Sequence, residues 1–261
     1  NERFQKTDAV DSRKLAKSLR AKDFKGIDIP EVKLEIDRAL IRQRVKLVKE
    51  IARYKNRVKS LLMQLDITIP ESFKSQSRHW SSPFIKWLQT IEHPEKTFGQ
   101  VINNYINAGQ HLRAELLSIT KQIKELSKAE RYIKKFELIN SIPGFGNSAG
   151  MFFLVQLGDI KRFKSDDELN YYVGLVPKMH ISGDKIQTGK LVKRGRKEMK
   201  IMLIEASWIA IRKDPALMIK FDELAKRMHK NKAIIRIARK LLNRIRYVLT
   251  NEVMYKSGIV D

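Results

Sequence analysis

The sequence predicts a mostly α-helical protein, and three observations support that prediction. Two long stretches, residues 31–65 and 97–139, repeat apolar residues at intervals of three and four, the spacing of an amphipathic helix. The stretch between them contains Pro70, Pro83 and Pro94, which interrupt helices. Beyond the second stretch the glycines cluster and the apolar repeats shorten, as expected for several short helices joined by turns.

The N-terminal part predicts one short helix that begins at residue 7 or 8. Thr7 or Asp8 is the expected N-cap, because a side-chain oxygen at that position accepts a hydrogen bond from a free backbone amide. Leu15 and Leu19 would form its apolar face.

The two long stretches predict a pair of long helices. Residues 31–65 contain no glycine or proline, so one uninterrupted helix is expected there. Two such helices joined by a proline-rich connector are typical of an antiparallel helical hairpin or coiled coil. The pair is either an extended spacer or a dimerisation arm, and the sequence favours neither.

The C-terminal part predicts a series of shorter elements. Ser165 and Glu168 have the spacing of a capping box, and the helix that they open would end at Gly174. Residues 176–192 alternate polar and apolar side chains around glycines, which indicates a loop or an irregular hairpin. Three further helices are expected over residues 194–212, from Asp214-Pro215 to about 228, and over 232–255.

The charge of the chain indicates a nucleic-acid partner. Lys and Arg number 53 against 29 Asp and Glu among 261 residues, a formal net charge of +24. Nucleic acid is the commonest partner that neutralises such an excess, and binding releases counterions from its phosphates. No apolar run approaches the ~18 residues that span a membrane. The absence of cysteine and the scattered histidines exclude a disulfide framework and a thiolate metal site.

The sequence Ile142-Pro-Gly-Phe-Gly146 resembles the turn of a helix-hairpin-helix, a module that grips a nucleic-acid backbone. Gly144 and Gly146 allow a tight turn, and the helix that follows would direct its free amides and its dipole toward a phosphate. The alternative is an ordinary glycine-rich turn between two helices. The charge of the whole chain favours the nucleic-acid interpretation.

Ser182 precedes Gly183 in a polar segment, just ahead of a dense run of basic residues. A serine beside a glycine is most often a turn residue, and the alternative is a nucleophile. His180 would share a strand face with Ser182 and is a weak candidate for a general base. The basic residues that follow are either a solvated phosphate-binding face, which we favour, or groups that neutralise a phosphate under attack. They are Lys185, Lys190, Lys193, Arg194, Arg196 and Lys197.

Asp8 and Asp11 are three residues apart and therefore lie on one face of the predicted N-terminal helix. Two carboxylates at this spacing suit a hard cation such as Mg²⁺. The alternative is a helix cap with a neighbouring surface charge, and a two-metal site usually needs more than two acids.

Taken in order, these motifs resemble one family, the DEDD-type transposases related to the Piv DNA invertase, which form the insertion-sequence family numbered one hundred and ten. Lys6-Thr-Asp-Ala-Val-Asp-Ser-Arg-Lys-Leu-Ala16 is similar to the family motif K-T-D-x-x-D-A-x-x-L-A, with Ser12 where alanine is usual. The C-terminal motifs of the family correspond to Ile142–Gly146, Gly158–Phe163, Tyr172–Pro177, Ser182-Gly183 and Lys193–Gly195.

The resemblance implies three regions. Residues 1–29 would be the C-terminal remnant of an α/β RuvC-like catalytic domain, and 30–138 a helical coiled-coil region. Residues 139–261 would be a helical, serine-containing transposase domain with the helix-hairpin-helix. In the family, the first Asp and the Glu of the acidic set lie upstream of the K-T-D motif, so this chain is expected to be a fragment or a truncated copy.

The resemblance also implies a mechanism and partners. Ser182 would attack a DNA phosphodiester and hold the strand as a phosphoserine ester, with Asp8 and Asp11 binding Mg²⁺. A structured guide RNA would select the DNA, and the protein would assemble as dimers and tetramers in the cytoplasm, at a bacterial or archaeal nucleoid. Two other functions stay open: a non-catalytic module that binds DNA or RNA, and a structural protein that forms oligomers through its long helices.

Overall fold

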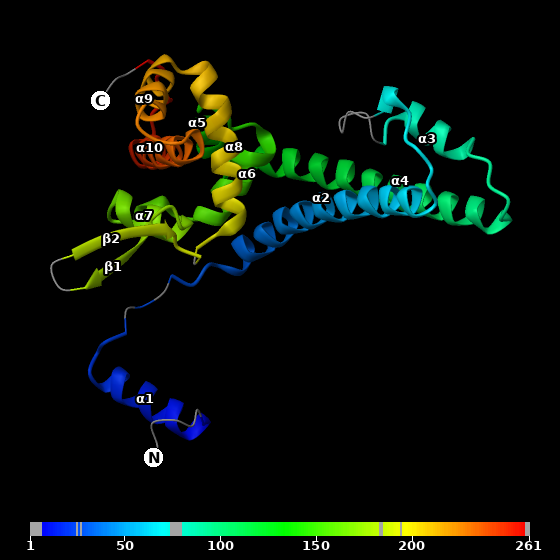
Figure 1. Cartoon of the computed structure of the whole chain (residues 1–261). Coiled ribbons are helices and arrows are strands. Elements are labelled where there is room, and N and C mark those ends of the chain that lie inside the picture. Colours follow the sequence, from blue (N-terminus) through cyan, green and yellow to red (C-terminus); the bar gives the residue numbers. More distant parts are fainter. Residues whose placement is uncertain are drawn as a thin grey trace. The chain divides into compact units, whose positions relative to one another are not determined.

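The computed structural model describes residues 7–24, 26, 28–73, 80–182, 185–193 and 195–258. Helices make up most of this part, and its strands form one two-stranded antiparallel sheet, so the mostly α-helical class is confirmed (Figure 1). The chain divides into two compact units, residues 1–32 and 33–261. Among the described helices, none is both long enough and apolar enough to cross a bilayer.

The first unit contains helix α1 (Asp8–Arg20). Thr7 is its N-cap, and its Oγ1 accepts a hydrogen bond from the amide of Val10 at 3.4 Å, which confirms the predicted start. Asp8 and Asp11 lie in the first turn, where the positive end of the helix dipole stabilises acidic side chains. No residue of α1 is buried, and Leu15 and Leu19 are exposed.

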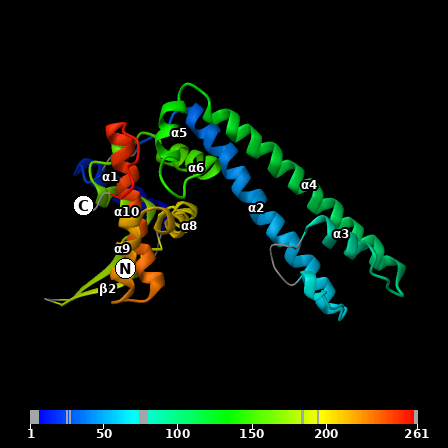
Figure 2. The ribbon, with the colours of Figure 1, turned by 90° about the horizontal axis from the view of Figure 1, so that it is seen from above.

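The two long helices of the second unit are α2 (Val32–Gln64) and α4 (Lys96–Ser127). They run side by side in both views of Figures 1 and 2. Their contacts follow opposite sequence directions, because Arg44 donates to Thr120 at 3.1 Å while the ring of Tyr54 packs edge-to-face on Tyr105 further along. The two long helices therefore run in opposite directions.

The connector between the long helices packs onto one end of the pair. It contains the short 3₁₀ helix η1 (Glu71–Phe73) and helix α3 (Ser82–Gln89), which begins at the cap residue Ser81. A small separate core forms where α3 meets α2 and α4. Its buried members are Val58, Leu62, Trp80, Phe84, Leu88, Phe98, Ile102 and Ile106.

The second long helix is shorter than its apolar period predicts. It ends at Ser127, and the chain starts a separate helix, α5 (Ile133–Asn140), after a turn that contains no glycine or proline. The turn lets two of its side chains reach Asp37 on α2. Arg131 contacts both carboxylate oxygens, at 2.8 and 3.1 Å, and the buried Tyr132 donates to Oδ2 at 2.7 Å. A bidentate ion pair and a buried hydrogen bond thus outweigh the local preference for one helix.

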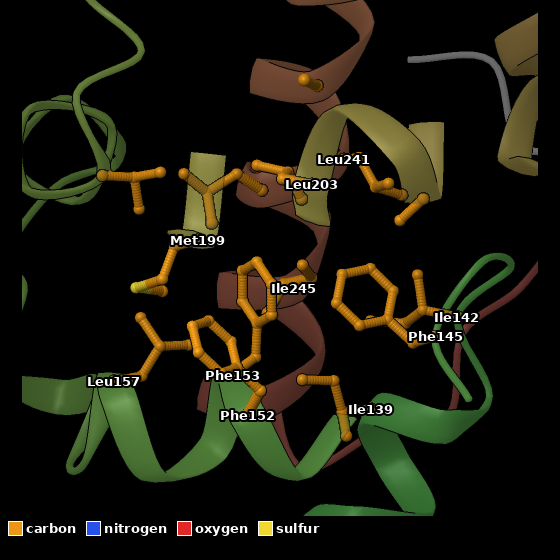
Figure 3. Packing of buried hydrophobic residues seen from close by; sticks show 14 of the residues in the cluster. Ile139, Ile142, Phe145, Phe152, Phe153, Leu157, Met199, Leu203, Leu241 and Ile245 are labelled. Atoms are coloured by element: carbon orange, nitrogen blue, oxygen red, sulfur yellow. The ribbon is translucent and has the colours of Figure 1, made fainter. Parts of the chain in front are cut away.

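The main core surrounds helix α6 (Asn147–Leu157). Its last eight residues are all buried, as expected for a helix that is apolar on every side and lies at the centre of a domain. Figure 3 shows Phe152, Phe153 and Leu157 of α6 among side chains from α5, α8 (Lys197–Lys213) and α10 (Lys230–Asn251). Ile41, Ile119 and Ile123 of the long helices belong to the same core. The domain boundary placed near residue 138 stays a prediction.

The segment after α6 contains the 3₁₀ helix η3 (Ile160–Arg162), helix α7 (Asp166–Val173) and the strands β1 (Pro177–Ser182) and β2 (Lys185–Leu191). Helix α7 has the predicted capping serine, Ser165, and the predicted left-handed glycine, Gly174, at its end. The two strands pair antiparallel with a register shift between Pro177 and Met179.

Gly144 fixes the approach of the α5–α6 turn to α8. Its φ of +92° is a left-handed conformation that side chains disfavour. A Cβ atom at Gly144 would lie 2.4 Å from the carbonyl oxygen of Ala206, so the turn and the α8 backbone are in direct contact. Only glycine fits this position, for two independent reasons.

Helix α9 (Pro215–Ala225) begins at the buried Asp214, as predicted. Its Oδ1 caps the helix by accepting from the amide of Ala216 at 2.9 Å, and its Oδ2 binds Arg244 at 2.8 Å and the hydroxyl of Tyr255. Burial by itself would raise the pKa of Asp214. The hydrogen bonds from Tyr255 and Gly258 and the charge of Arg244 outweigh it and hold that pKa below its usual value.

Replacing Asp214 with asparagine tests this buried contact. Asp214→Asn keeps a capping oxygen but leaves Arg244 without its carboxylate, so we expect the free energy of unfolding at pH 7 to fall by about 3 kcal/mol. Because folding lowers the pKa, the wild-type advantage is present above the ordinary value of 3.8 and is lost as pH falls through the folded value. Urea unfolding at pH 7 and at pH 3 measures the difference; a gap of equal size at both would contradict it. Asp222→Asn, at an exposed position of α9, is the matched control.

A second substitution tests the contact between Gly144 and α8. Gly144→Ala introduces both backbone strain and a clash with Ala206, so we expect a loss of about 2–4 kcal/mol in the free energy of unfolding. Gly99→Ala in α4 is the control, because the added methyl group has open space in a helix and is expected to be neutral or stabilising by up to ~1 kcal/mol. Equal tolerance of both substitutions would show that the close approach at Gly144 is not needed.

Candidate nucleic-acid interface

The predicted helix-hairpin-helix consists of α5, the turn at residues 141–146 and α6. Gly146 is the N-cap of α6, is exposed, and has no atom within 4 Å of an added Cβ. The first amides of α6 have no partner within the helix, and Gly146 has no side chain to cap them. Together with the helix dipole, this arrangement suits a phosphate oxygen. The two glycines of the motif therefore differ: Gly144 packs on α8, and Gly146 leaves the start of α6 open.

The other end of α6 is held by side chains from three elements. The buried Arg38 of α2 donates through Nε to the carbonyl of Val155 at 2.6 Å and through a second nitrogen to that of Gln156 at 3.2 Å. The hydroxyl of Tyr172 donates to the same Gln156 carbonyl at 3.0 Å. Arg162 completes the set with a 3.1 Å hydrogen bond to the carbonyl of Leu157. These groups satisfy the carbonyls that a helix leaves unpaired at its C-terminal end.

Tyr172 also lies between two arginines. The guanidinium of Arg162 is 4.8 Å from the centre of the Tyr172 ring, and that of Arg196 is 5.2 Å from it. Arginine over an aromatic ring gains cation–π attraction while its N–H groups remain able to donate. Arg196, an exposed residue that the sequence placed in the phosphate-binding run, is therefore positioned by the ring of Tyr172.

Gly195 determines where α8 begins. Its φ is +106°, and a Cβ there would lie 2.8 Å from the backbone of Gly174, so the two backbones touch. The chain turns at this point, and α8 starts at Lys197 rather than at residue 194 as its sequence pattern predicts. The local periodicity could not predict this later start of α8, because its cause is a contact with Gly174, which is distant in the sequence.

The structure describes most of the predicted phosphate-binding residues. Lys190, Lys193, Arg196 and Lys197 are exposed, consistent with a solvated basic face. Lys185 pairs through its backbone with Ser182 at the start of β2, and its side chain is outside the described part of the structure. Arg194 lies outside the described residues.

Ser182 is the last residue of β1, and His180 is in the same strand, paired with Gln187. The strand that the sequence suggested for these two residues is thus present. Their side chains and the following Gly183 lie outside the described part of the structure, so the nucleophile and base assignments stay predictions.

Asp8 and Asp11 lie one helical turn apart in α1. Within the described residues, no group of three or more His, Asp or Glu side chains could hold a metal ion. Two carboxylates are fewer than a two-metal site uses, so the described residues by themselves do not complete a metal centre.

Sequence reasoning missed three residues that organise this region. Arg162 and Tyr172 lie inside motifs that the sequence analysis matched to the family. In the structure their side chains donate hydrogen bonds to carbonyls at the end of α6. Arg38 carried no such signal. It is one basic residue among many in α2, and only its burial against α6 distinguishes it.

Two family models match the chain. One, described as transposase of the IS116/IS110/IS902 family, matches residues 136–222. The other, a DEDD transposase model of the IS110 type, matches residues 1–67. The first range contains the α5–α6 turn, the β-hairpin and the start of α8. The second contains α1 with its two aspartates and continues through α2, beyond the boundary predicted at residue 29.

The chain is also similar to curated proteins. A transposase for insertion sequence element IS1111A from Coxiella burnetii is 23% identical over 258 residues, which cover 97% of the chain and 69% of that protein. The putative transposase y4qE of Sinorhizobium fredii is 22% identical over 78% of the chain and 47% of its own length. The pilin gene-inverting protein of Moraxella bovis is 29% identical over 57% of the chain and 49% of its own length.

The chain thus spans between about half and about two thirds of the length of these relatives. Both family models and the names of the relatives agree with the resemblance that the ordered motifs suggested. Residues 136–222 and 1–67 are thus similar to transposases of the IS116/IS110/IS902 and IS110 types.

Proposed function

We propose that this chain is the strand-joining and nucleic-acid-binding part of a DNA transposase. The observation that carries the proposal is the family match over residues 136–222, which includes Ser182 and the basic segment that follows it. The relatives' names add that proteins of this kind move insertion sequences or invert a pilin gene. Moving or inverting a DNA segment requires that DNA strands be cut and rejoined.

The proposed chemistry is a pair of transesterifications at Ser182. In the first, Oγ of Ser182 attacks the phosphorus of a DNA phosphodiester, forms a phosphoserine ester and releases a sugar hydroxyl, which takes up a proton. In the second, a hydroxyl of another strand attacks the same phosphorus, forms a new phosphodiester and returns the proton to Ser182. One ester replaces another at each step, so the sequence of steps needs no external energy source.

Binding is assigned to the open start of α6 at Gly146 and to the exposed residues Lys190, Lys193, Arg196 and Lys197. Contacts from amides and cations to phosphates hold the backbone without reading its sequence. The choice of DNA site would therefore come from another source, and a guide RNA is the source that the family resemblance supports.

Two further parts of the proposal rest on the resemblance. Asp8 and Asp11 would contribute to a Mg²⁺ site whose remaining ligands are outside the described residues. The α2–α4 pair would join copies of the chain into dimers or tetramers. Exposed apolar side chains on these helices, Val48, Val101 and Leu117 among them, would be available for such contacts.

A nucleic-acid-binding module without strand cleavage is the second candidate function. The observation that favours it is that Asp8 and Asp11 have no third acidic partner within the described residues. Such a module would use the same basic surface and would form no covalent bond to DNA.

The test is a covalent-adduct assay with the chain, Mg²⁺, the labelled genomic DNA that flanks its gene and RNA transcribed from that region. We expect an adduct that survives SDS for the wild type. For Ser182→Ala, adduct and strand transfer should fall by at least ~10³-fold, because the nucleophile is removed, while DNA affinity should stay unchanged.

Ser118→Ala is the matched control, because Ser118 is an exposed serine of α4 and its loss should leave the adduct intact. An undiminished adduct for Ser182→Ala would exclude Ser182 as the nucleophile. Salt-sensitive DNA binding by the wild type without any adduct would favour the binding module instead.

A further inference from the structure

A hollow of about 250 Å³ opens between the long helix α2 and the C-terminal helices. Its walls come from α2, α6 and the start of α8. It is smaller than the roughly 300–1,000 Å³ of typical small-molecule pockets, so it suits one compact group rather than a whole cofactor. The lining residues are Arg42, Val45, Lys46, Lys49, Phe152, Gln156, Arg196, Glu198 and Met199.

The side chains that line the hollow have a net positive charge. Four of its side chains are cationic and Glu198 is the single acid among them. Glu198 is already bound by Lys49 at 3.0 Å, and this hydrogen bond, with others, lowers the pKa of Glu198. The remaining positive charge comes from Arg42 and Lys46, one turn apart on α2, and from Arg196, which is far away in the sequence.

Arg196 is positioned toward this cluster by the contacts already described. Gly195 turns the chain against Gly174, and the guanidinium of Arg196 lies 5.2 Å from the centre of the Tyr172 ring. The hydroxyl of Tyr172 is held by the carbonyl of Gln156, a residue that also lines the hollow. A fixed guanidinium loses less conformational entropy when it binds an anion.

Glu35 lies at the edge of this cluster, and its carboxylate pairs mainly with Arg38. Arg38 contacts it at 2.6 Å, whereas Arg42 reaches its other oxygen at 3.6 Å, beyond normal hydrogen-bond length. The hydrogen bond from Arg38 lowers the pKa of Glu35 most, and the charges of Arg42 and Arg196 lower it further. The positive charges of α2 and of the start of α8 thus act on the same carboxylate, that of Glu35.

We propose that Arg42, Lys46 and Arg196 form a composite site for one backbone phosphate of a bound nucleic acid. The site makes α2 part of the nucleic-acid surface, in addition to its role in the helical pair. The bound phosphate would lie where α2 meets the start of α8. Guanidinium and ammonium groups match the charge and the hydrogen-bonding of a phosphodiester. The apolar side chains of Val45, Phe152 and Met199 lower the local dielectric, which strengthens the attraction. This inference rests on the proposed nucleic-acid binding and does not require strand cleavage.

The test compares two double variants that remove the same charge. Arg42→Gln with Lys46→Gln removes both positive charges that α2 contributes to the site. Lys121→Gln with Lys124→Gln, at exposed positions of α4 that do not line the hollow, is the control. Binding of a mixed-sequence DNA duplex and of an RNA stem-loop is measured by fluorescence anisotropy over a salt series. We expect the first variant to lose about 10-fold in affinity and the salt slope to fall by about 0.9, the value for one phosphate contact.

The control variant should lose less than about 3-fold in affinity and keep the wild-type salt slope, because it changes net charge without removing the contact. A loss confined to DNA or to RNA would identify which backbone occupies the site, and a loss for both would mean that either can. Equal effects of the two double variants would overturn the proposal.

A third measurement asks whether the three residues share one phosphate. Arg196→Gln is combined with the α2 variant in a double-mutant cycle. If the residues bind the same phosphate, the combined loss in affinity should be clearly smaller than the product of the separate losses, whereas independent contacts multiply. Multiplying losses would overturn the composite site even if each residue contributes to binding.

Wild-type protein provides a check that does not depend on the folding of variants. Lysine acetylation, followed by mass spectrometry with and without the DNA duplex and the RNA stem-loop, should show protection of Lys46 and not of Lys121. Protection of neither lysine would contradict the proposal. Because no step of these measurements requires a covalent adduct, a failure of Ser182 as nucleophile would leave their results unchanged.

Discussion

The C-terminal end of α6 is the point on which the arrangement of the larger unit depends. Three consecutive carbonyls there, of Val155, Gln156 and Leu157, accept hydrogen bonds from Arg38, Tyr172 and Arg162. A helix end buried without partners would cost several kcal/mol, and its partial negative charge favours cations. The same contacts therefore satisfy α6 and fix α2, η3 and α7 against it. The surface that carries Arg196 follows from this arrangement, because Tyr172 holds Arg196 in turn.

Glycines complete the arrangement by allowing backbones to touch. Gly144 meets Ala206 of α8, and Gly195 meets Gly174 at the end of α7. Gly158, with a φ of +64°, lies where a Cβ would approach Leu34 of α2. Each of these glycines belongs to a motif that the sequence analysis matched to the transposase family. In the structure, the absence of a side chain at these glycines allows neighbouring elements to approach closely. This close packing in turn places the basic side chains and the open start of α6.

The candidate site was predictable only in part. The basic run after β2 and the exposed Gly146 follow from residue type and local pattern, and the structure agrees with the exposure expected for Lys190, Lys193 and Lys197. The contribution of α2 was not predictable, because Arg42 and Lys46 look like any polar positions of an amphipathic helix. Their proximity to Arg196 is a consequence of tertiary packing.

The sequence by itself determined the helical class and the cap residues Ser165 and Asp214, because these depend on local periodicity and on side chains that bond to nearby amides. It left two alternatives for the cap of α1, Thr7 or Asp8, and two for residues 176–192, a loop or an irregular hairpin. Tertiary structure alone decided that α4 ends at Ser127 and that α8 begins at Lys197. The physical reason is the same in both cases. A contact with a distant partner, Asp37 for Arg131 and Gly174 for Gly195, is worth more than the continuation of a helix, whose preference per residue is a fraction of a kcal/mol.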